Sequence, residues 1–322
     1  MSTGSSKVSV VLVTWRRPEH VRRCLASLAL MPELPHEVLV VDASEDDLTA
    51  NAVRSFSFAE RLAFPGGAGR MTTARNRGLA ASTGAVIAYL DDDTEVRPGW
   101  LREVGRRFGE DPALLAACGR TCNGVPGEER GTEQVGRVLP DGRLTGNFAV
   151  LVETLVHIDH GIGANMMFRR DALVALHGFR DDFPGTALRE DADAFLRITS
   201  TGGKALFLPN AVVDHHGAPH VNGRRFGYRY WFWATHNHAL LLSRNFGLGS
   251  PLFRTWLGSA ARESLTHRGG NPLTTPSKIV APLCGLLAGV ITGIRKATIR
   301  PLPPDVMRRG SRRPAVVRLD RR

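Results

Sequence analysis

Three consecutive carboxylates, Asp91, Asp92 and Asp93, follow a short apolar run and are the residues best suited to chemistry. Like charges packed this closely repel one another, and a bound cation would offset that repulsion. Carboxylate oxygens favour Mg²⁺ or Mn²⁺, ions that keep coordination positions open for substrate phosphates. A solvated acidic turn is the alternative interpretation, but a position at the end of a strand favours a ligand site.

A second acidic pair, Glu190-Asp191, stands at the start of a predicted helix. The helix dipole stabilises acidic side chains there, so capping alone would account for the pair. The chemical alternative is a general base that takes a proton from a reacting hydroxyl. A cluster of one Asp and three His over residues 214–220 offers a further metal ligand, and the sequence does not separate His215 from His216.

The elements that must position these residues alternate between strand and helix. Continuous apolar runs predict buried parallel strands at residues 8–13, 38–41 and 86–90. Helices are predicted from Pro18, over residues 73–81 and from Pro98. This order predicts an α/β fold in which helices cover both faces of a mostly parallel sheet. Ligands of such sheets bind beyond the carboxyl ends of the strands, where the three carboxylates lie.

Later segments are less regular. Asp141-Gly142 predicts the turn of a hairpin over residues 138–144. Further helices are predicted from Asp171, from Glu190 and over residues 228–242, and a short strand at 205–208 is expected to end before Pro209.

Seven motifs occur in a fixed order over residues 7 to 245: Val8-Ser-Val-Val-Leu-Val-Thr14-Trp15-Arg16-Arg17-Pro18, Val40-Val41-Asp42-Ala43-Ser44, Ala74-Arg75-Asn76-Arg77-Gly78, Tyr89-Leu90-Asp91-Asp92-Asp93, Gly163-Ala164-Asn165-Met166-Met167-Phe168-Arg169-Arg170 with Gly178-Phe179, Glu190-Asp191, and the stretch from Pro209 to His215. In this order they resemble family 2 of the inverting glycosyltransferases, which have the GT-A fold (Rossmann-like, with a mostly parallel central sheet). The resemblance implies transfer of a sugar from a nucleotide-diphosphate donor to an acceptor hydroxyl.

The resemblance also implies roles for the acidic residues. Asp93 would be the main ligand of Mn²⁺ or Mg²⁺, with Asp91 nearby and His215 as a further ligand. Asp191 would be the general base of a single displacement that inverts the anomeric carbon without a covalent enzyme intermediate. The sequence departs from the family at Arg189, where many relatives have a small or hydroxylic residue, and the departure concerns the acceptor side.

Other motif residues would contact the donor. The resemblance places Thr14 and Asp42 at the base and ribose, Asp92 at the ribose, and Arg75 at the base or a phosphate. For Arg75 the alternative is a solvated helix arginine. The full set expected to bind the nucleotide sugar is Thr14, Asp42, Arg75, Asp91, Asp92, Asn165 and Glu190.

Composition and charge limit the partners. A hydrophobic fraction of 43% and a charged fraction of 23% are those of a folded soluble protein. The net charge is +11, but residues 295–322 carry ten Lys or Arg against two Asp, so this segment accounts for +8 of it. Such a basic segment suits an anionic membrane surface as well as it suits nucleic acid, whereas the nearly balanced charge of the remainder argues against nucleic-acid binding by the body of the chain. A disordered solubilising tail is the alternative interpretation.

Location is predicted from the cysteines and the N-terminal residues. Four scattered cysteines, at 24, 118, 122 and 284, predict reduced thiols and no disulfide framework. The first seven residues are polar and lead directly into a strand pattern without a signal-peptide core. We therefore expect a cytoplasmic enzyme at the inner face of the cell membrane.

Sixteen residues without charge, 279–294, would form a helix of about 24 Å, shorter than a hydrocarbon core of about 30 Å. We expect a shallow membrane contact rather than a span, and a buried helix is the main competing interpretation.

The chain is expected to divide into four parts. Residues 1–110 would bind the nucleotide sugar, 111–220 the glycan or lipid-linked acceptor, 221–294 would be a helical extension that associates with the membrane, and 295–322 a basic tail. Two other functions compete with sugar transfer. A nucleotidyltransferase would need a Gly-rich loop after the first strand, which this sequence lacks. A non-enzymatic membrane or nucleic-acid binder would leave both acidic stretches unexplained.

Overall fold

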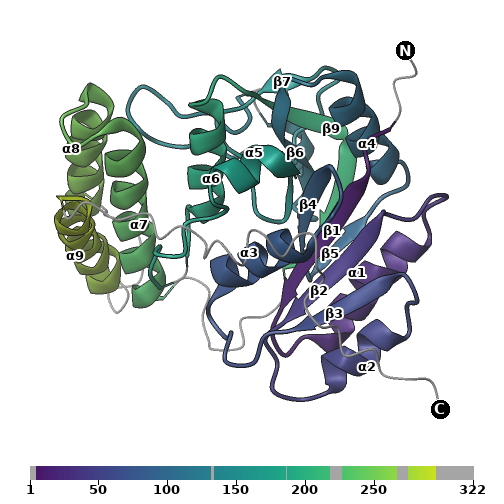
Figure 1. Cartoon of the computed structure of the whole chain (residues 1–322). Coiled ribbons are helices and arrows are strands. Elements are labelled where there is room, and N and C mark those ends of the chain that lie inside the picture. Colours follow the sequence, from purple (N-terminus) through teal and green to yellow (C-terminus); the bar gives the residue numbers. More distant parts are fainter. Residues whose placement is uncertain (1–4, 132–133, 186, 218–226, 267–274, 295–322) are drawn as a thin grey trace.

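The computed structural model describes residues 5–131, 134–185, 187–217, 227–266 and 275–294 of the 322-residue chain. Its strands are β1 (Val8–Thr14), β2 (Glu37–Asp42), β3 (Ala59–Ala63), β4 (Val86–Asp91), β5 (Thr94–Val96), β6 (Leu114–Cys122), β7 (Val156–His157), β8 (Asn165–Arg169) and β9 (Lys204–His215). They form one sheet in the order β3-β2-β1-β4-β8-β6-β9-β5, and β7 pairs with β9 (Figure 1).

Helices cover both faces of this sheet, as predicted. They are α1 (Pro18–Ala29), α2 (Leu48–Arg54), α3 (Met71–Ala81), α4 (Trp100–Glu110), α5 (Arg170–Ala175), α6 (Glu190–Thr199), α7 (Tyr228–Phe246), α8 (Pro251–Thr266) and α9 (Thr275–Ile294). Val10 and Leu12 of β1 pack with α1 and α4 on one face, while Val11 packs with α3, α5 and α6 on the other. Apolar side chains on both faces are why this strand reads as a continuous apolar run.

The sheet is parallel from β3 through β2 and β1 to β4, and it becomes mixed beyond β4. β8 runs antiparallel to both β4 and β6, and β6 is parallel to β9. The expected nucleotide-binding and acceptor-binding halves therefore share one sheet, joined by the pairing of β4 with β8.

β9 does not end before Pro209, and this corrects the prediction. Its pairing with β6 shifts between Gly119 and Thr121, so that Leu208 and Val213 have partners while Pro209 falls in the irregular stretch. Proline has no N–H to donate, and such an irregularity tolerates it. The strand continues to His215, which pairs opposite Thr94 of β5.

Helix α3 lies unusually close to β1. A side chain at Gly78 would put its Cβ 2.3 Å from Cγ1 of Val11, so only glycine permits this approach. This close contact fixes the distance between the sheet and the preceding turn of α3.

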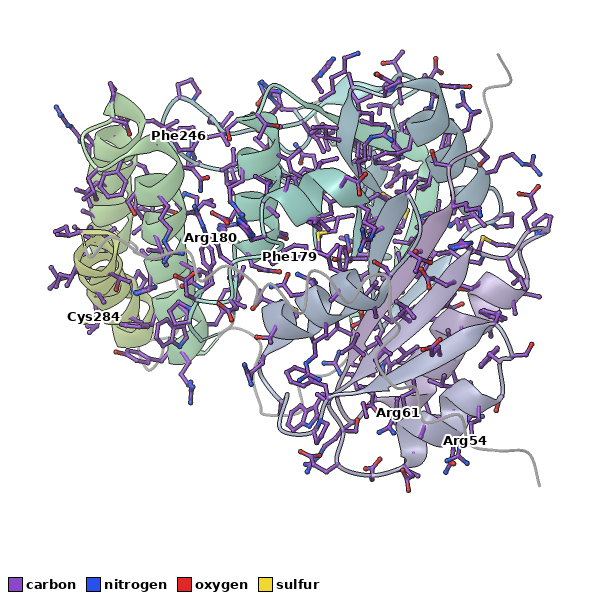
Figure 2. The ribbon with its side chains drawn as sticks, in the orientation of Figure 1. Arg54, Arg61, Phe179, Arg180, Phe246 and Cys284 are labelled. Carbon is purple, nitrogen blue, oxygen red and sulfur yellow. The ribbon has the colours of Figure 1, made fainter. Side chains whose placement is uncertain are left out.

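The C-terminal helices α7, α8 and α9 pack on one another at the side of the molecule away from β3 (Figure 1). They form the expected helical extension. In the part of the chain that the structure describes, no helix is long and apolar enough to cross a membrane. The basic tail predicted for residues 295–322 lies outside the described residues. All four cysteines are free thiols, and Cys284, on the outer side of α9 (Figure 2), is the exposed one.

Candidate active site

The three consecutive carboxylates lie at the carboxyl end of β4, where the chain turns into β5. This end adjoins those of β1 and β2, because Thr14 pairs with Asp42 in the same register. From that edge the three side chains have different protein partners: Asp91 contacts Arg75 of α3, Asp92 contacts Thr14 of β1 and Arg17 just before α1, and Asp93 contacts His215 at the end of β9. The motif therefore contacts three separate parts of the fold.

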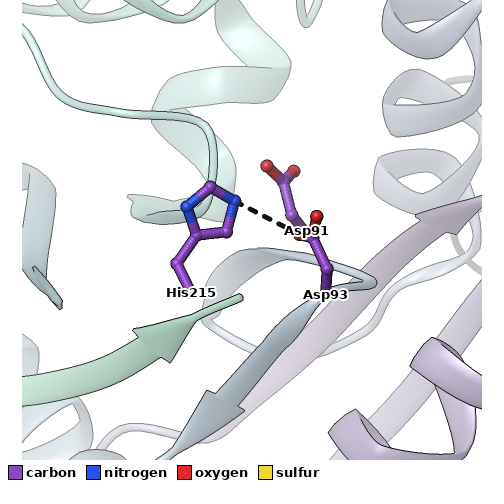
Figure 3. A group of neighbouring side chains, drawn as sticks. All are labelled: Asp91, Asp93 and His215. Carbon is purple, nitrogen blue, oxygen red and sulfur yellow. Dashed lines mark ion pairs between the residues drawn. The ribbon is translucent and has the colours of Figure 1, made fainter. Parts of the chain in front are cut away.

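Asp91, Asp93 and His215 form a candidate metal centre. Each offers one ligand atom, and these atoms lie within 4.8 Å of one another. Nε2 of His215 is 3.2 Å from Oδ1 of Asp93 (Figure 3). His216 is directed elsewhere, with its Nε2 2.9 Å from Oε1 of Glu95. The geometry thus separates the two histidines that are equivalent in the sequence.

The surroundings of His215 fit a metal ligand. Its Nδ1 lies 3.0 Å from Oδ1 of Asn123, and this contact assigns the ring proton to Nδ1. Nε2 then presents a lone pair to the Asp93 carboxylate, which is repulsive unless a proton or a cation lies between them. Carboxylates suit both Mg²⁺ and Mn²⁺, and the imidazole favours Mn²⁺ because Mg²⁺ prefers oxygen ligands.

We expect His215→Ala to weaken Mn²⁺ binding at least about tenfold, since losing even an outer-shell partner costs roughly 10–100-fold. His216→Ala is the matched control and should bind Mn²⁺ like the unmodified protein. Titration calorimetry with Mn²⁺ measures both affinities. Equal losses in the two variants would show that His215 has no special place at the metal.

Asp92 is held on the β1 side by two donors. Oγ1 of Thr14 donates to Oδ2 at 2.7 Å, and Nη1 of Arg17 donates to Oδ1 at 3.0 Å. Burial raises the pKa of Asp92 to about 6, against the lowering effect of the Arg17 guanidinium. Arg17 lies in the first motif, but the sequence indicated no role for it, because this contact spans 75 positions.

Arg75 joins the two acidic stretches. Its Nη1 donates to Oε1 of Glu190 at 2.5 Å, and its Nη2 lies 3.6 Å from Oδ1 of Asp91. The guanidinium is buried and lies over the ring of Phe179, which excludes the solvated helix arginine. Removing one partner of a buried ion pair costs about 3–5 kcal/mol, because the other charge is left uncompensated. Arg75 therefore holds β4 and α6 in a fixed relation.

Glu190 and Asp191 begin α6, next to Arg75. The N–H of Gly163 donates to Oδ2 of Asp191 at 3.1 Å, and that of Ala192 donates to Oδ1 at 2.7 Å. Burial and the Asp191 carboxylate raise the pKa of Glu190 to about 7, against the lowering effect of Arg75. Glu190 is buried while Asp191 is only half-buried, so Asp191 is the member of the pair that a substrate can reach.

Arg189, the departure from the family pattern, has a left-handed backbone with φ +82°. Residues other than glycine rarely adopt this conformation, and it costs of order 1–3 kcal/mol. Burial lowers the pKa of the Arg189 guanidinium, and the neighbouring Asp191 carboxylate opposes that effect. The Arg189 guanidinium thus places a positive charge beside Asp191.

Asp42 lies at the end of β2 with its carboxylate fully buried. Nε of Arg61 donates to Oδ2 at 2.7 Å, and the N–H of Ser44 donates to Oδ1 at 2.9 Å. Any contact with a base must therefore use the remaining acceptor capacity of this carboxylate or the backbone around it. Arg61, on β3, had no motif by which the sequence could identify it.

Asn165, which was expected to bind the donor, lies in the interior of the sheet. Its amide is fully buried at the start of β8. Oδ1 accepts a hydrogen bond from Nε1 of Trp100 at 3.0 Å, and Nδ2 donates to the carbonyl of Ala211 at 2.9 Å. The amide links β8, β9 and α4.

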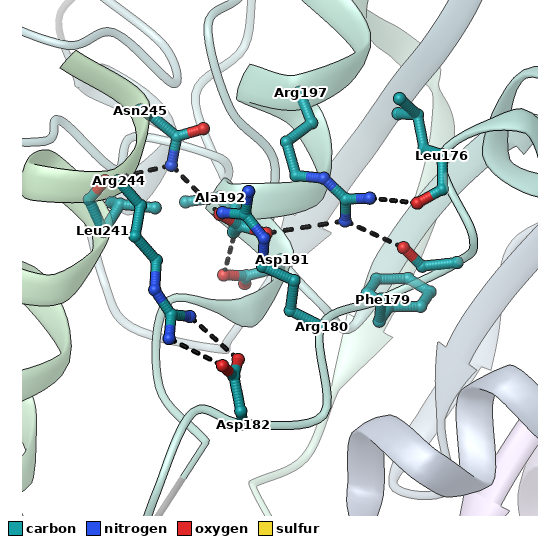
Figure 4. A network of polar contacts seen from close by, with 12 residues as sticks. Leu176, Phe179, Arg180, Asp182, Asp191, Ala192, Arg197, Leu241, Arg244 and Asn245 are labelled. Atoms are coloured by element: carbon teal, nitrogen blue, oxygen red, sulfur yellow. Dashed lines mark hydrogen bonds and ion pairs between the residues drawn. The ribbon is translucent and has the colours of Figure 1, made fainter. Parts of the chain in front are cut away.

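A cavity of about 520 Å³ opens beside α3 and α6. Phe179, which lies under Arg75, is part of its wall, whereas the three metal-cluster residues are not. The wall is held by a polar network in which Nη1 of Arg180 donates to Oδ1 of Asp193 at 2.6 Å (Figure 4). Asn245 of α7 donates to the same oxygen at 3.0 Å, so the network also attaches the C-terminal helices.

The fold of the chain matches solved structures of the GT-A class. S. aureus TarS in complex with UDP-GlcNAc has a TM-score of 0.59 at 14% identity, covering 89% of this chain and 82% of that one. The mannosyltransferase PcManGT from Pyrobaculum calidifontis in complex with GDP-Man and Mn²⁺ has a TM-score of 0.53 at 18% identity, covering 91% and 88%. At these identities the likeness shows the GT-A fold.

The model of the family described as Glycosyl transferase family 2 matches residues 9–176, more than half of this chain. The protein therefore belongs to glycosyl transferase family 2. Among curated relatives, glycosyltransferase AglE of Haloferax volcanii is 35% identical over 100 residues, which cover 29% of this chain and 33% of that protein. The Escherichia coli glycosyltransferase YibD is 26% identical over 150 residues, covering 45% and 43%. This chain thus matches less than half the length of either relative.

Proposed function

We propose that the protein is an inverting glycosyltransferase that moves a sugar from a nucleotide-diphosphate donor to a hydroxyl of a glycan or lipid-linked acceptor. One observation carries this proposal: Arg75 contacts both Asp91 and Glu190, so acids about a hundred positions apart converge on one site. A structural ion pair alone would not explain a metal-ligand set on one side and the half-buried Asp191 on the other.

The donor side would consist of the metal cluster and the strand ends. Asp91, Asp93 and His215 would hold Mn²⁺ or Mg²⁺, which when bound supplies positive charge to the leaving diphosphate. Thr14 and Asp92, joined by a hydrogen bond, would position the ribose. TarS is in complex with UDP-GlcNAc, and PcManGT is in complex with GDP-Man and Mn²⁺, which supports a nucleotide-sugar donor for this chain.

The acceptor side would be served by Asp191. Its carboxylate would take the proton of the acceptor hydroxyl as that oxygen attacks the anomeric carbon. The bond from that carbon to the phosphate oxygen breaks, and the nucleoside diphosphate leaves with the electron pair. Gly163, whose N–H donates to Asp191, would orient the base. Attack opposite the leaving group inverts the anomeric configuration in one step.

A donor screen tests this function directly. We expect one nucleotide sugar among UDP-, GDP- and dTDP-linked donors to raise the melting temperature in the presence of Mn²⁺, with a smaller rise after Mn²⁺ is removed with a chelator. The preferred donor is then incubated with the protein, and the released nucleotide is identified. Nucleoside diphosphate is expected, while release of the sugar 1-phosphate with nucleotidyl transfer would favour the nucleotidyltransferase. No stabilisation by any donor would contradict the proposal.

Its place in the cell is also part of the proposal. Free thiols and a lipid-linked acceptor are consistent with a cytoplasmic enzyme in peripheral contact with the anionic inner face of the membrane. A variant that ends at residue 294 separates this role from the chemistry. It should keep donor turnover on a soluble acceptor analogue, whereas a simple binder would lose its only function.

A further inference from the structure

Helix α9 has one face fixed against α7. Ala281 and Leu286 are buried there, and the glycines bring the two backbones together. A Cβ at Gly285 would lie 2.2 Å from the carbonyl oxygen of Phe232, so the helices could not approach this closely with a larger residue. Oγ1 of Thr292 also lies 3.1 Å from Nε2 of His236, which sets the register. This face belongs to the protein core and cannot meet lipid.

The opposite face of α9 is an apolar stripe exposed to solvent. Its side chains are Val280, Cys284, Leu287, Ile291 and Ile294, at alternating spacings of four and three residues that place them along one line of the helix. Leu287 is 65% exposed and Ile294 62%. Single exposed apolar residues are ordinary, but a contiguous row of five indicates an interaction surface.

Two occupants fit an apolar stripe with this spacing, a second copy of the chain and a membrane. A helix pair between copies needs apolar spacing sustained over three to four heptads and charged flanking residues that set the pairing. The stripe spans only about two heptads, and residues 279–294 contain no charged side chain. The segment after them, residues 295–322, has a net charge of +8, which is complementary to anionic lipid headgroups.

We infer that the apolar stripe of α9 lies in the headgroup region of an anionic membrane, with the helix parallel to the surface. The apolar side chains enter the boundary of the acyl chains, and the basic segment 295–322 adds attraction to anionic lipid. This inference deepens the membrane placement proposed above and names the surface that makes the contact. It does not depend on which sugar is transferred, or on transfer at all.

Sedimentation with vesicles tests the inference on the full chain. We expect binding to vesicles of phosphatidylcholine with about one third phosphatidylglycerol, and much weaker binding to phosphatidylcholine alone. Leu287→Glu should lower the partition coefficient roughly tenfold, because it places a charge in the stripe. The matched control is Leu30→Glu on the far side of the molecule, which makes the same change at another exposed leucine and should bind as before.

Two further measurements keep the result interpretable. The melting temperature and the far-UV circular dichroism spectrum of Leu287→Glu should equal those of the unmodified protein, which shows that the variant is folded. Analytical ultracentrifugation of both proteins tests the competing occupant. The inference is overturned if the unmodified protein does not bind anionic vesicles, if Leu287→Glu binds them equally well, or if this substitution converts a dimer to a monomer.

Discussion

Asp191→Asn is expected to lower the turnover number for sugar transfer by roughly 10²–10⁴-fold and to leave donor affinity within about twofold. The amide has the shape of the carboxylate but cannot take the proton of the acceptor hydroxyl. Its carbonyl oxygen can still accept the hydrogen bond that the N–H of Gly163 donates to Asp191, and only the contact with the N–H of Ala192 is lost, so the link between α6 and Gly163 should be kept. Steady-state kinetics with the preferred donor measures the rate, and calorimetry measures donor affinity.

The matched control for this substitution is Asp171→Asn, which makes the same change at a fully exposed side chain of α5. It should transfer sugar at the unmodified rate. Near-normal transfer by Asp191→Asn would remove Asp191 as the base. A parallel loss of donor affinity would instead show that Asp191 has a structural or donor-binding role.

Asp93→Ala is expected to abolish the dependence of nucleotide binding on Mn²⁺. Asp93 is buried and faces His215, so its loss removes the central carboxylate of the candidate metal centre. We expect Mn²⁺ affinity to fall more than about 100-fold, beyond the effect of losing an outer-shell partner. Calorimetric titration of Mn²⁺ alone, and then of the nucleoside diphosphate with and without Mn²⁺, separates metal binding from nucleotide binding.

Asp171→Ala serves as the control for that experiment and should bind Mn²⁺ normally. If Asp93→Ala kept its metal-linked nucleotide affinity, the metal would have to bind elsewhere, and the pairing of Asp93 with His215 would be an ordinary ion pair. This result would not affect the assignment of Asp191 as the general base. The metal site and the general base can therefore be tested separately.

The strands that could be predicted from the sequence are those buried on both faces of the sheet. β1, β2 and β4 are buried on both faces and read as continuous apolar runs. β3, with the sequence Ala-Glu-Arg-Leu-Ala, was not predicted, because it is an edge strand whose side chains are only half-buried. β9 was predicted too short, since the shift in its pairing around Pro209 depends on the neighbouring strand.

Candidate site residues could be predicted when their place in the sequence, such as directly after a strand, indicated a ligand site. Asp91 and Asp93 follow a strand directly, and α/β sheets place ligands there. Arg17 and Asn123 were not found, because each acts through a contact across 75 or more positions. The sequence did not indicate that the Asn165 amide links strands and a helix, because its partners, Trp100 and Ala211, are distant in the sequence.

The absence of a side chain at Gly78 has a consequence for substrates that never come near it. Gly78 sets the distance between α3 and β1, and it lies one helical turn after Arg75. The guanidinium of Arg75 contacts both Asp91 and Glu190. Added bulk behind the helix would push that guanidinium forward and force it to give up one carboxylate or the other. In the proposed mechanism, this buried glycine would thereby set the separation between the metal cluster and Asp191.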